Sequence, residues 1–244
     1  MSTEIRFTDT HLHLDRMTDP ELCLSRLRSL GIRRFVVPDV ACSLTEWDFS
    51  APGVYRCFGC HPGYAASFRR CPVRSDTLAV GECGLEPSES DEERLQEEVF
   101  ASQVKTAREH GLPLVIHSIR RDDAILHLLK DLQFSGGGVI HGFGGSWQMA
   151  RRWLDAGFYL GIGTLLLNPA AARLRQAVVY AGAGRILLET DAPCFRNVRA
   201  EALIDVAAAC SQLLGVDMAD LSRATENSAG KLFGFDPLDR DQTF

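Results

Sequence analysis

Long apolar runs are missing from this sequence. No stretch of its 244 residues approaches the ~18 consecutive apolar residues that a membrane-spanning helix needs, so we expect no membrane association. The segment Met1–Arg6 also lacks the basic and then apolar order of a secretory signal peptide, from which we expect a cytoplasmic protein. Repeats, low-complexity tracts and linker compositions are absent too, which predicts a single domain over residues 1–244.

Positive charge is in deficit, because 26 Lys and Arg stand against 32 Asp and Glu, a formal net charge of −6. A field of this sign repels phosphate backbones, so a nucleic-acid substrate would need a local group of cations. The 45% of hydrophobic and 24% of charged residues are typical of a folded globular protein and exclude a disordered or collagen-like chain. Nothing in the sequence indicates an obligate protein partner, and we expect a monomer.

The eight cysteines lie inside apolar runs of a long chain and do not frame a short, loop-rich one, so we expect most of them to be reduced core residues. Cys57, Cys60 and His61 form the CxxCH pattern of covalent haem attachment. Because the two cysteines fall on a predicted strand of a cytoplasmic protein, we favour ordinary strand packing over haem, and over a structural zinc held with Cys71.

Short apolar runs rich in Val, Ile and Phe alternate with amphipathic segments along the chain. The predicted strands are 5–10, 34–38, 55–59, 78–81, 114–117, 138–141, 158–163 and 186–190. The predicted helices are 19–30, 91–110, 121–132, 147–156, 170–181, 200–214 and 218–231. This alternation is typical of parallel strands joined by right-handed crossovers, and eight such strands predict an α/β fold of the (β/α)8 TIM-barrel type.

Polar side chains end several of these strands, at the edge where a TIM barrel builds its active site. They are His11, His13, Glu82, His117, His141 and Asp191. His11 and His13 lie two residues apart in an extended segment, so both imidazoles point to one side and can reach one ion. Core packing would bury unpaired imidazoles and a carboxylate beside aliphatic residues at a desolvation cost, so we interpret the set as a metal site.

Four histidines and two carboxylates exceed what one catalytic zinc ion needs, so we expect two divalent ions that share a carboxylate. Two such ions can stabilise the attacking and leaving oxygens of a phosphoester and lower the pKa of a bridging water. The set therefore predicts a hydrolase that uses no organic cofactor.

Six motifs that contain these residues follow one another along the chain. They are Thr8–Leu14 (TDTHLHL), Gly59–Gly63 (GCHPG), Ala79–Leu85 (AVGECGL), Pro113–Ser118 (PLVIHS), Val139–Phe143 (VIHGF) and Leu188–Pro193 (LETDAP). Together they resemble the TatD family of metal-dependent hydrolases, a branch of the amidohydrolase-like barrels, over nearly the whole chain. The resemblance implies a deoxyribonuclease, often one that acts from DNA ends, with Mg2+, Mn2+ or Zn2+ as its ions.

The resemblance also implies a role for each residue of the set. One ion would be held by His11, His13 and Asp191, the other by His117 and His141, with Glu82 as the bridge. Asp191 would in addition orient or deprotonate the attacking water. His61 would join Asp191 and Glu82 as a catalytic residue by contacting a substrate phosphate, although it could instead be a loop-packing residue fixed by Pro62.

Three departures from the family pattern concern the substrate. Glu86 stands where the family has an aspartate, and Ile119 stands where it commonly has an arginine, which leaves Arg120 or Arg121 to contact a phosphate. The segment 195–199 is shorter than usual, and its Arg196 is the third candidate for a substrate cation.

Two other functions remain open on the sequence. An amidohydrolase acting on a C–N or ester bond of a small molecule would use the same barrel and ions against a carbonyl, and Glu82 in place of a bridging lysine disfavours it. A scaffold that keeps metal only for structure is disfavoured by the complete ligand set.

Overall fold

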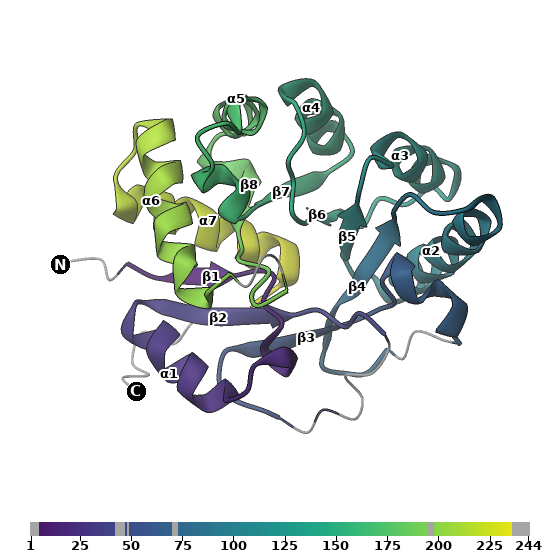
Figure 1. Cartoon of the computed structure of the whole chain (residues 1–244), viewed down its shortest axis with the longest axis horizontal. Coiled ribbons are helices and arrows are strands. Elements are labelled where there is room, and N and C mark those ends of the chain that lie inside the picture. Colours follow the sequence, from purple (N-terminus) through teal and green to yellow (C-terminus); the bar gives the residue numbers. More distant parts are fainter. Residues whose placement is uncertain (1–4, 42–46, 48, 70–72, 195–197, 236–244) are drawn as a thin grey trace.

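A single sheet of eight parallel strands forms a nearly closed barrel in the computed structural model, which describes residues 5–41, 47, 49–69, 73–194 and 198–235 (Figure 1). The strands pair in sequence order, β1 to β8. They are β1 Phe7–Asp9, β2 Ile32–Val37, β3 Val54–Phe58, β4 Thr77–Leu85, β5 Leu114–Ser118, β6 Gly138–Ile140, β7 Phe158–Ile162 and β8 Ile186–Leu188. The predicted TIM barrel is confirmed.

Seven α-helices lie around the sheet within the described part of the chain (Figure 1). They are α1 Pro20–Ser29, α2 Ser90–His110, α3 Asp122–Asp131, α4 Trp147–Asp155, α5 Ala172–Ala181, α6 Leu203–Leu214 and α7 Met218–Phe233. The predicted helix 200–214 begins as a 3-10 turn at Ala200–Ala202, and the 3-10 helix Pro62–Ser67 stands between β3 and β4. Of the described helices, none is by itself long and apolar enough to cross a membrane.

The helix ends follow from local chemistry. The Asp19 carboxylate accepts a hydrogen bond from the Leu22 amide at 2.9 Å and so caps the first turn of α1, which begins with Pro20. Gly111 ends α2 in the left-handed conformation, at φ 64°, that glycine adopts without steric cost. These caps set where each helix turns back toward the next strand.

The two faces of the sheet bury different clusters. Large side chains such as Phe35, Phe58 and Phe158 fill the space between strands and helices. The barrel interior holds smaller strand residues, namely Val36, Cys57, Ala79, Val115, Val139 and Leu187. Ala229 and Phe233 of α7 pack against them. Because side chains on a strand alternate with period two, the residues two positions further along these strands also point inward, toward the mouth of the barrel.

The described cysteines, which are 23, 57, 60, 83, 194 and 210, are all free thiols. Cys57 is buried in the barrel interior on β3, as strand packing predicted, whereas Cys60 is buried beyond the end of that strand, in a cluster with Ala65 and Val99. Cys71, named above as a third zinc ligand, lies outside the described residues.

The ring closes between β1 and β8 through the segments that follow them. The Thr10 amide donates to the Leu188 carbonyl at 2.9 Å, and the Asp191 amide donates to the His11 carbonyl at 2.8 Å. The closure of the barrel therefore brings His11 and Asp191 together, although they lie at opposite ends of the sequence.

Candidate metal centre

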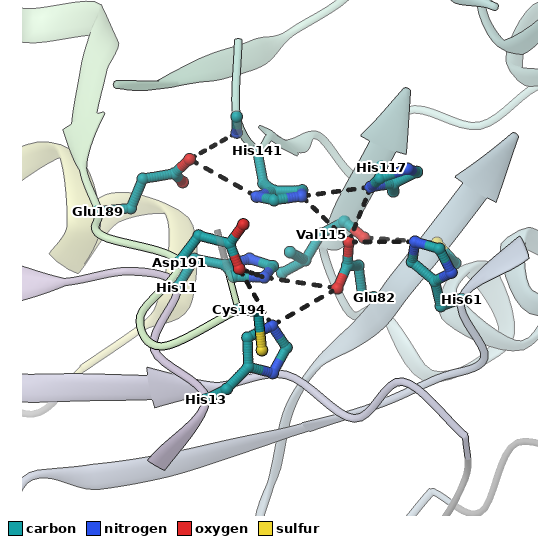
Figure 2. Close-up of polar contacts among 12 residues, drawn as sticks. His11, His13, His61, Glu82, Val115, His117, His141, Glu189, Asp191 and Cys194 are labelled. Atoms are coloured by element: carbon teal, nitrogen blue, oxygen red, sulfur yellow. Dashed lines mark hydrogen bonds and ion pairs between the residues drawn. The ribbon is translucent and has the colours of Figure 1, made fainter. Parts of the chain in front are cut away.

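Glu82 lies at the centre of a group of histidines at the barrel mouth (Figure 2). Its Oε1 is 2.9 Å from His117 Nδ1 and 3.0 Å from His141 Nε2. Its Oε2 is 3.4 Å from His11 Nε2 and 4.0 Å from His13 Nε2. The two oxygens of one buried carboxylate thus face two different pairs of imidazoles.

A β-bulge turns Glu82 into the barrel. Val80 pairs with Leu114 and Cys83 pairs with Ile116, so two residues of β4 lie opposite Val115 alone. Ala79 points inward and Cys83 packs on the helix side, so an unbroken alternation from Ala79 would point Glu82 outward. The predicted strand stopped at residue 81, whereas β4 continues through the bulge to residue 85.

Glycine is required where the bulge meets its neighbour. A Cβ at Gly81 would lie 2.4 Å from the Val115 carbonyl oxygen, and one at Gly84 would lie 1.8 Å from that of His117. Any side chain at these positions would push β4 and β5 apart. The glycines of the AVGECGL motif therefore allow the strand contact that positions Glu82.

Asp191 completes the group from the turn after β8. Its φ of 57° lies in the left-handed region, and its Oδ1 is 3.2 Å from His13 Nε2 and 3.9 Å from His11 Nε2. The turn is fixed by Asp9, whose carboxylate accepts hydrogen bonds from the Thr190 hydroxyl at 2.6 Å, the Thr190 amide at 3.1 Å and the His11 amide at 3.2 Å. Asp9 thus ties both ligand-bearing segments to one point.

Two further carboxylates lie behind the histidines. Glu189 Oε1 accepts a hydrogen bond from the Gly142 amide and lies 3.6 Å from His141 Nδ1. Glu86 Oε2 lies 3.4 Å from His117 Nε2, so the longer side chain at this position reaches a histidine ring. A carboxylate that accepts the second ring proton of a ligand histidine fixes its tautomer and orientation.

Several buried polar atoms of this group make no hydrogen bond within the protein. They include both ring nitrogens of His11, which is fully buried, and Glu189 Oε2. Buried polar atoms are nearly always satisfied in folded proteins. Unsatisfied imidazole nitrogens beside carboxylates are the donor set of a divalent metal ion, so the residues present fit such an ion.

The charges of the group depend strongly on one another. Burial alone would raise the pKa of Glu82, but the charges of His141 and His11 hold it well below its usual value. Burial opposes protonation of His13, yet its contacts with Asp191 and Cys194 raise its pKa to about 10. Glu82 likewise raises the pKa of His141 against the effect of burial. The carboxylates therefore attract positive charge to this site, whether protons or metal ions.

His61 lies at the edge of the group, and its two ring nitrogens have different partners. Nδ1 accepts a hydrogen bond from the Gly63 amide at 3.0 Å, while Nε2 lies 3.9 Å from Glu82 Oε1. Burial lowers the pKa of His61 to about 4, against the opposing charge of Glu82, so the ring is neutral at pH 7. Because Nδ1 accepts, Nε2 carries the proton and faces the cavity as a donor.

A cavity of about 170 Å³ opens over these residues. It is lined by His13, Arg16, Val40, His61, Tyr64, Glu82, His117, His141, Asp191 and Cys194. Sequence reasoning missed Arg16, Tyr64 and Cys194, because no local pattern shows that a residue of a short 3-10 helix or of a turn points toward a distant strand end. Glu189 was also missed, although it follows Leu187 at the spacing of two that marks the inward face.

None of the three arginines predicted to bind substrate is found at the described cavity. Arg121 forms ion pairs with Glu93 at 3.1 Å and Glu97 at 3.4 Å on α2, and it does not line the described cavity. Arg120, with φ 54°, does not line it either. Arg196 lies outside the described residues.

The barrel and its histidine-carboxylate centre define the protein as a metal-dependent hydrolase of the TIM-barrel class. A family model described as TatD related DNase matches residues 8–234, and the chain belongs to this family.

Relatives and solved structures agree with that assignment. The metal-dependent hydrolase YjjV of Escherichia coli is 32% identical over 209 residues, which are 77% of this chain and 80% of that protein. The crystal structure of this YjjV protein superimposes with a TM-score of 0.84 and 27% sequence identity, and the match covers 96% of this chain and 100% of the YjjV chain. The 3'-5' ssDNA/RNA exonuclease TatD of Klebsiella pneumoniae is 33% identical over 135 residues, 54% of this chain and 51% of that protein.

Proposed function

We propose that the protein is a nuclease that hydrolyses phosphodiester bonds of DNA with two divalent ions, Mg2+, Mn2+ or Zn2+. The observation that carries this proposal is the position of Glu82, whose Oε1 faces His117 and His141 while its Oε2 faces His11 and His13. One carboxylate oxygen toward each histidine pair is the arrangement expected of a bridge between two ions. When bound, such ions would supply a water of lowered pKa and stabilise the oxygens of the phosphoester.

Asp191 has the properties of the proton acceptor. Burial raises the pKa of its carboxyl, but the hydrogen bond from His13 and the charges of His11 and His141 lower it below its usual value. The group is therefore an anion at neutral pH, and it lines the cavity. A positioned anionic carboxylate at the cavity wall can orient a water and take its proton.

The substrate phosphate would be held by neutral and charged donors. His61 presents Nε2–H to the cavity, and Arg16 brings a guanidinium to its wall. With a net charge of −6 in the chain, a local cation beside the site is what a phosphate ligand requires.

The test is a substrate panel. Purified protein, first treated with chelator, is incubated with single-stranded DNA, RNA, a cyclic phosphodiester and simple amides, each with Mg2+, Mn2+ or Zn2+. We expect metal-dependent release of mononucleotides from DNA. The same assay with Glu82→Gln controls for a contaminating nuclease. Turnover of amides without turnover of any phosphodiester would overturn the proposal and favour an amidohydrolase.

A further inference from the structure

A cysteine joins the candidate metal centre on the side of His13 and Asp191 (Figure 2). His13, Asp191 and Cys194 each offer one ligand atom, and these atoms all lie within 4.8 Å of one another. The Cys194 amide donates to the Asp191 carbonyl at 2.9 Å, so the turn after β8 folds back on itself. This turn places the sulfur beside the ring of His13.

A second observation indicates a ligand in the same place. The buried His11 Nε2 lies 3.4 Å from Glu82 Oε2 and 3.9 Å from Asp191 Oδ1, and it makes no hydrogen bond in the protein. A fully buried imidazole nitrogen that makes no hydrogen bond, next to two carboxylates, lacks the partner that such groups normally have. A soft or borderline divalent cation would satisfy all of them together.

Cys194 also differs from the other described cysteines. Cys57, Cys60, Cys83 and Cys210 are buried, and none of them lines the cavity. Cys194 is exposed and lines it, and Arg16 Nη1 donates a hydrogen bond to its sulfur at 3.5 Å. A thiol at a cavity wall is accessible to an ion from solvent, whereas the buried thiols pack as apolar residues.

We propose that Cys194 Sγ is a protein ligand of the ion that His13 and Asp191 hold, and that this sulfur makes the site prefer Zn2+ over Mg2+. The proposal rests on the metal centre of the proposed function. On coordination the thiol releases its proton to solvent, one S–metal bond forms, and nothing is oxidised or reduced. Thiolate favours Zn2+, whereas Mg2+ requires oxygen ligands, so the sulfur discriminates between the two.

The two halves of the centre would then differ in chemistry. His117, His141 and Glu82 supply nitrogen and oxygen atoms, which accept Zn2+ or Mn2+. The half with Cys194 adds a sulfur to nitrogen and oxygen. Zn2+ should therefore bind first on the His13 side, and that ion should be the harder one to exchange for Mg2+.

Cobalt spectroscopy tests the sulfur ligand directly. Protein stripped by chelator is reloaded with Co2+, and absorption is recorded in the near ultraviolet, where thiolate-to-cobalt charge transfer appears, and in the visible, where ligand-field bands report bound cobalt. We expect both in the wild type. Cys194→Ser should keep the visible bands and lose the charge-transfer band, and Cys23→Ser, a half-buried thiol on α1, should keep both.

Three other outcomes of the cobalt experiment would overturn the sulfur ligand. Visible bands without charge transfer in the wild type would overturn the sulfur ligand and leave the metal centre of the proposed function intact. A wild-type protein that binds no cobalt would overturn both. A charge-transfer band that survives in folded Cys194→Ser would assign the ligand to another cysteine and overturn the proposal.

Competition dialysis measures the predicted preference. A ligand histidine's outer partners alone are worth about 10–100-fold in metal affinity, so loss of a direct ligand should weaken Zn2+ binding by at least about tenfold in Cys194→Ser. The affinity for Mg2+ should not change. Equal Zn2+ affinity in the wild type and Cys194→Ser, with both proteins showing the same thermal unfolding after chelation, would overturn the preference.

Discussion

Replacement of Glu82 by glutamine tests the centre of the site. The change keeps the shape of the side chain and removes the anion that lies 2.9 Å from His117 and 3.0 Å from His141. If Glu82 is shared by two ions, both should bind more weakly, because each loses the same charged ligand. Substitution at any other position of the site would affect one ion more than the other.

The magnitude can be worked out as a shift in thermal stability. A ligand at 100 times its Kd stabilises the folded protein by about 2.7 kcal/mol. For a domain of this size, 1 kcal/mol corresponds to about 2–4 °C in Tm, so each ion should raise the wild-type Tm by about 5–11 °C. If Glu82→Gln weakens binding about 100-fold, the gain per ion falls to about 0.4 kcal/mol, or about 1–2 °C.

The assay is thermal unfolding of each protein with and without metal, together with elemental analysis of the loaded sample. Comparing each protein with itself separates lost metal binding from the loss of the ion pairs that Glu82 makes with the histidines. Glu86→Gln is the matched control, because it removes a carboxylate that lies 3.4 Å from His117 at the edge of the group. If Glu86→Gln weakens one ion about tenfold and leaves the other unchanged, this variant should keep about three quarters of the total wild-type gain from the two ions. If metal raises the Tm of Glu82→Gln by as much as it raises that of the wild type, the bridging role is refuted.

Three further predictions concern single residues. Asp191→Asn should remain folded and retain at least the ion held by His117, His141 and Glu82, but lose about 10²–10⁴-fold in kcat, as expected for loss of a positioned base. Near wild-type turnover of the loaded variant would place the base elsewhere. Arg16→Ala should raise KM for DNA with little change in kcat, whereas Arg121→Ala, which only breaks ion pairs to α2, should leave KM unchanged; equal effects would contradict this assignment. Because the pKa of His13 is raised to about 10, its ring must lose a proton before it can bind a metal ion. Metal affinity should therefore increase as pH rises from 6 to 9, by up to about tenfold per pH unit for one proton. Calorimetry in buffers of different ionisation heat would detect the released proton, and a pH-independent affinity would contradict this prediction.

The sequence alone determined the elements of the barrel and the inward direction of several ligands. Apolar runs of strand length mark β5 and β6, and His117 and His141 follow Val115 and Val139 at a spacing of two. Side-chain alternation is a property of the extended backbone itself, so it can be read without knowing what the strand packs against. The same holds for the HxH pair after β1.

Only the tertiary structure decided which side chains enter the site where the alternation is broken or where the residue lies outside a strand. Alternation alone would turn Glu82 outward, and the bulge opposite Val115 turns it inward. Arg121 reaches Glu93 and Glu97, while Arg16 and Cys194 reach the cavity. Periodicity describes a single strand, whereas a bulge depends on the register of two strands. The reach of a loop side chain depends on how the chain closes around the barrel, and both are fixed only when distant segments pack together.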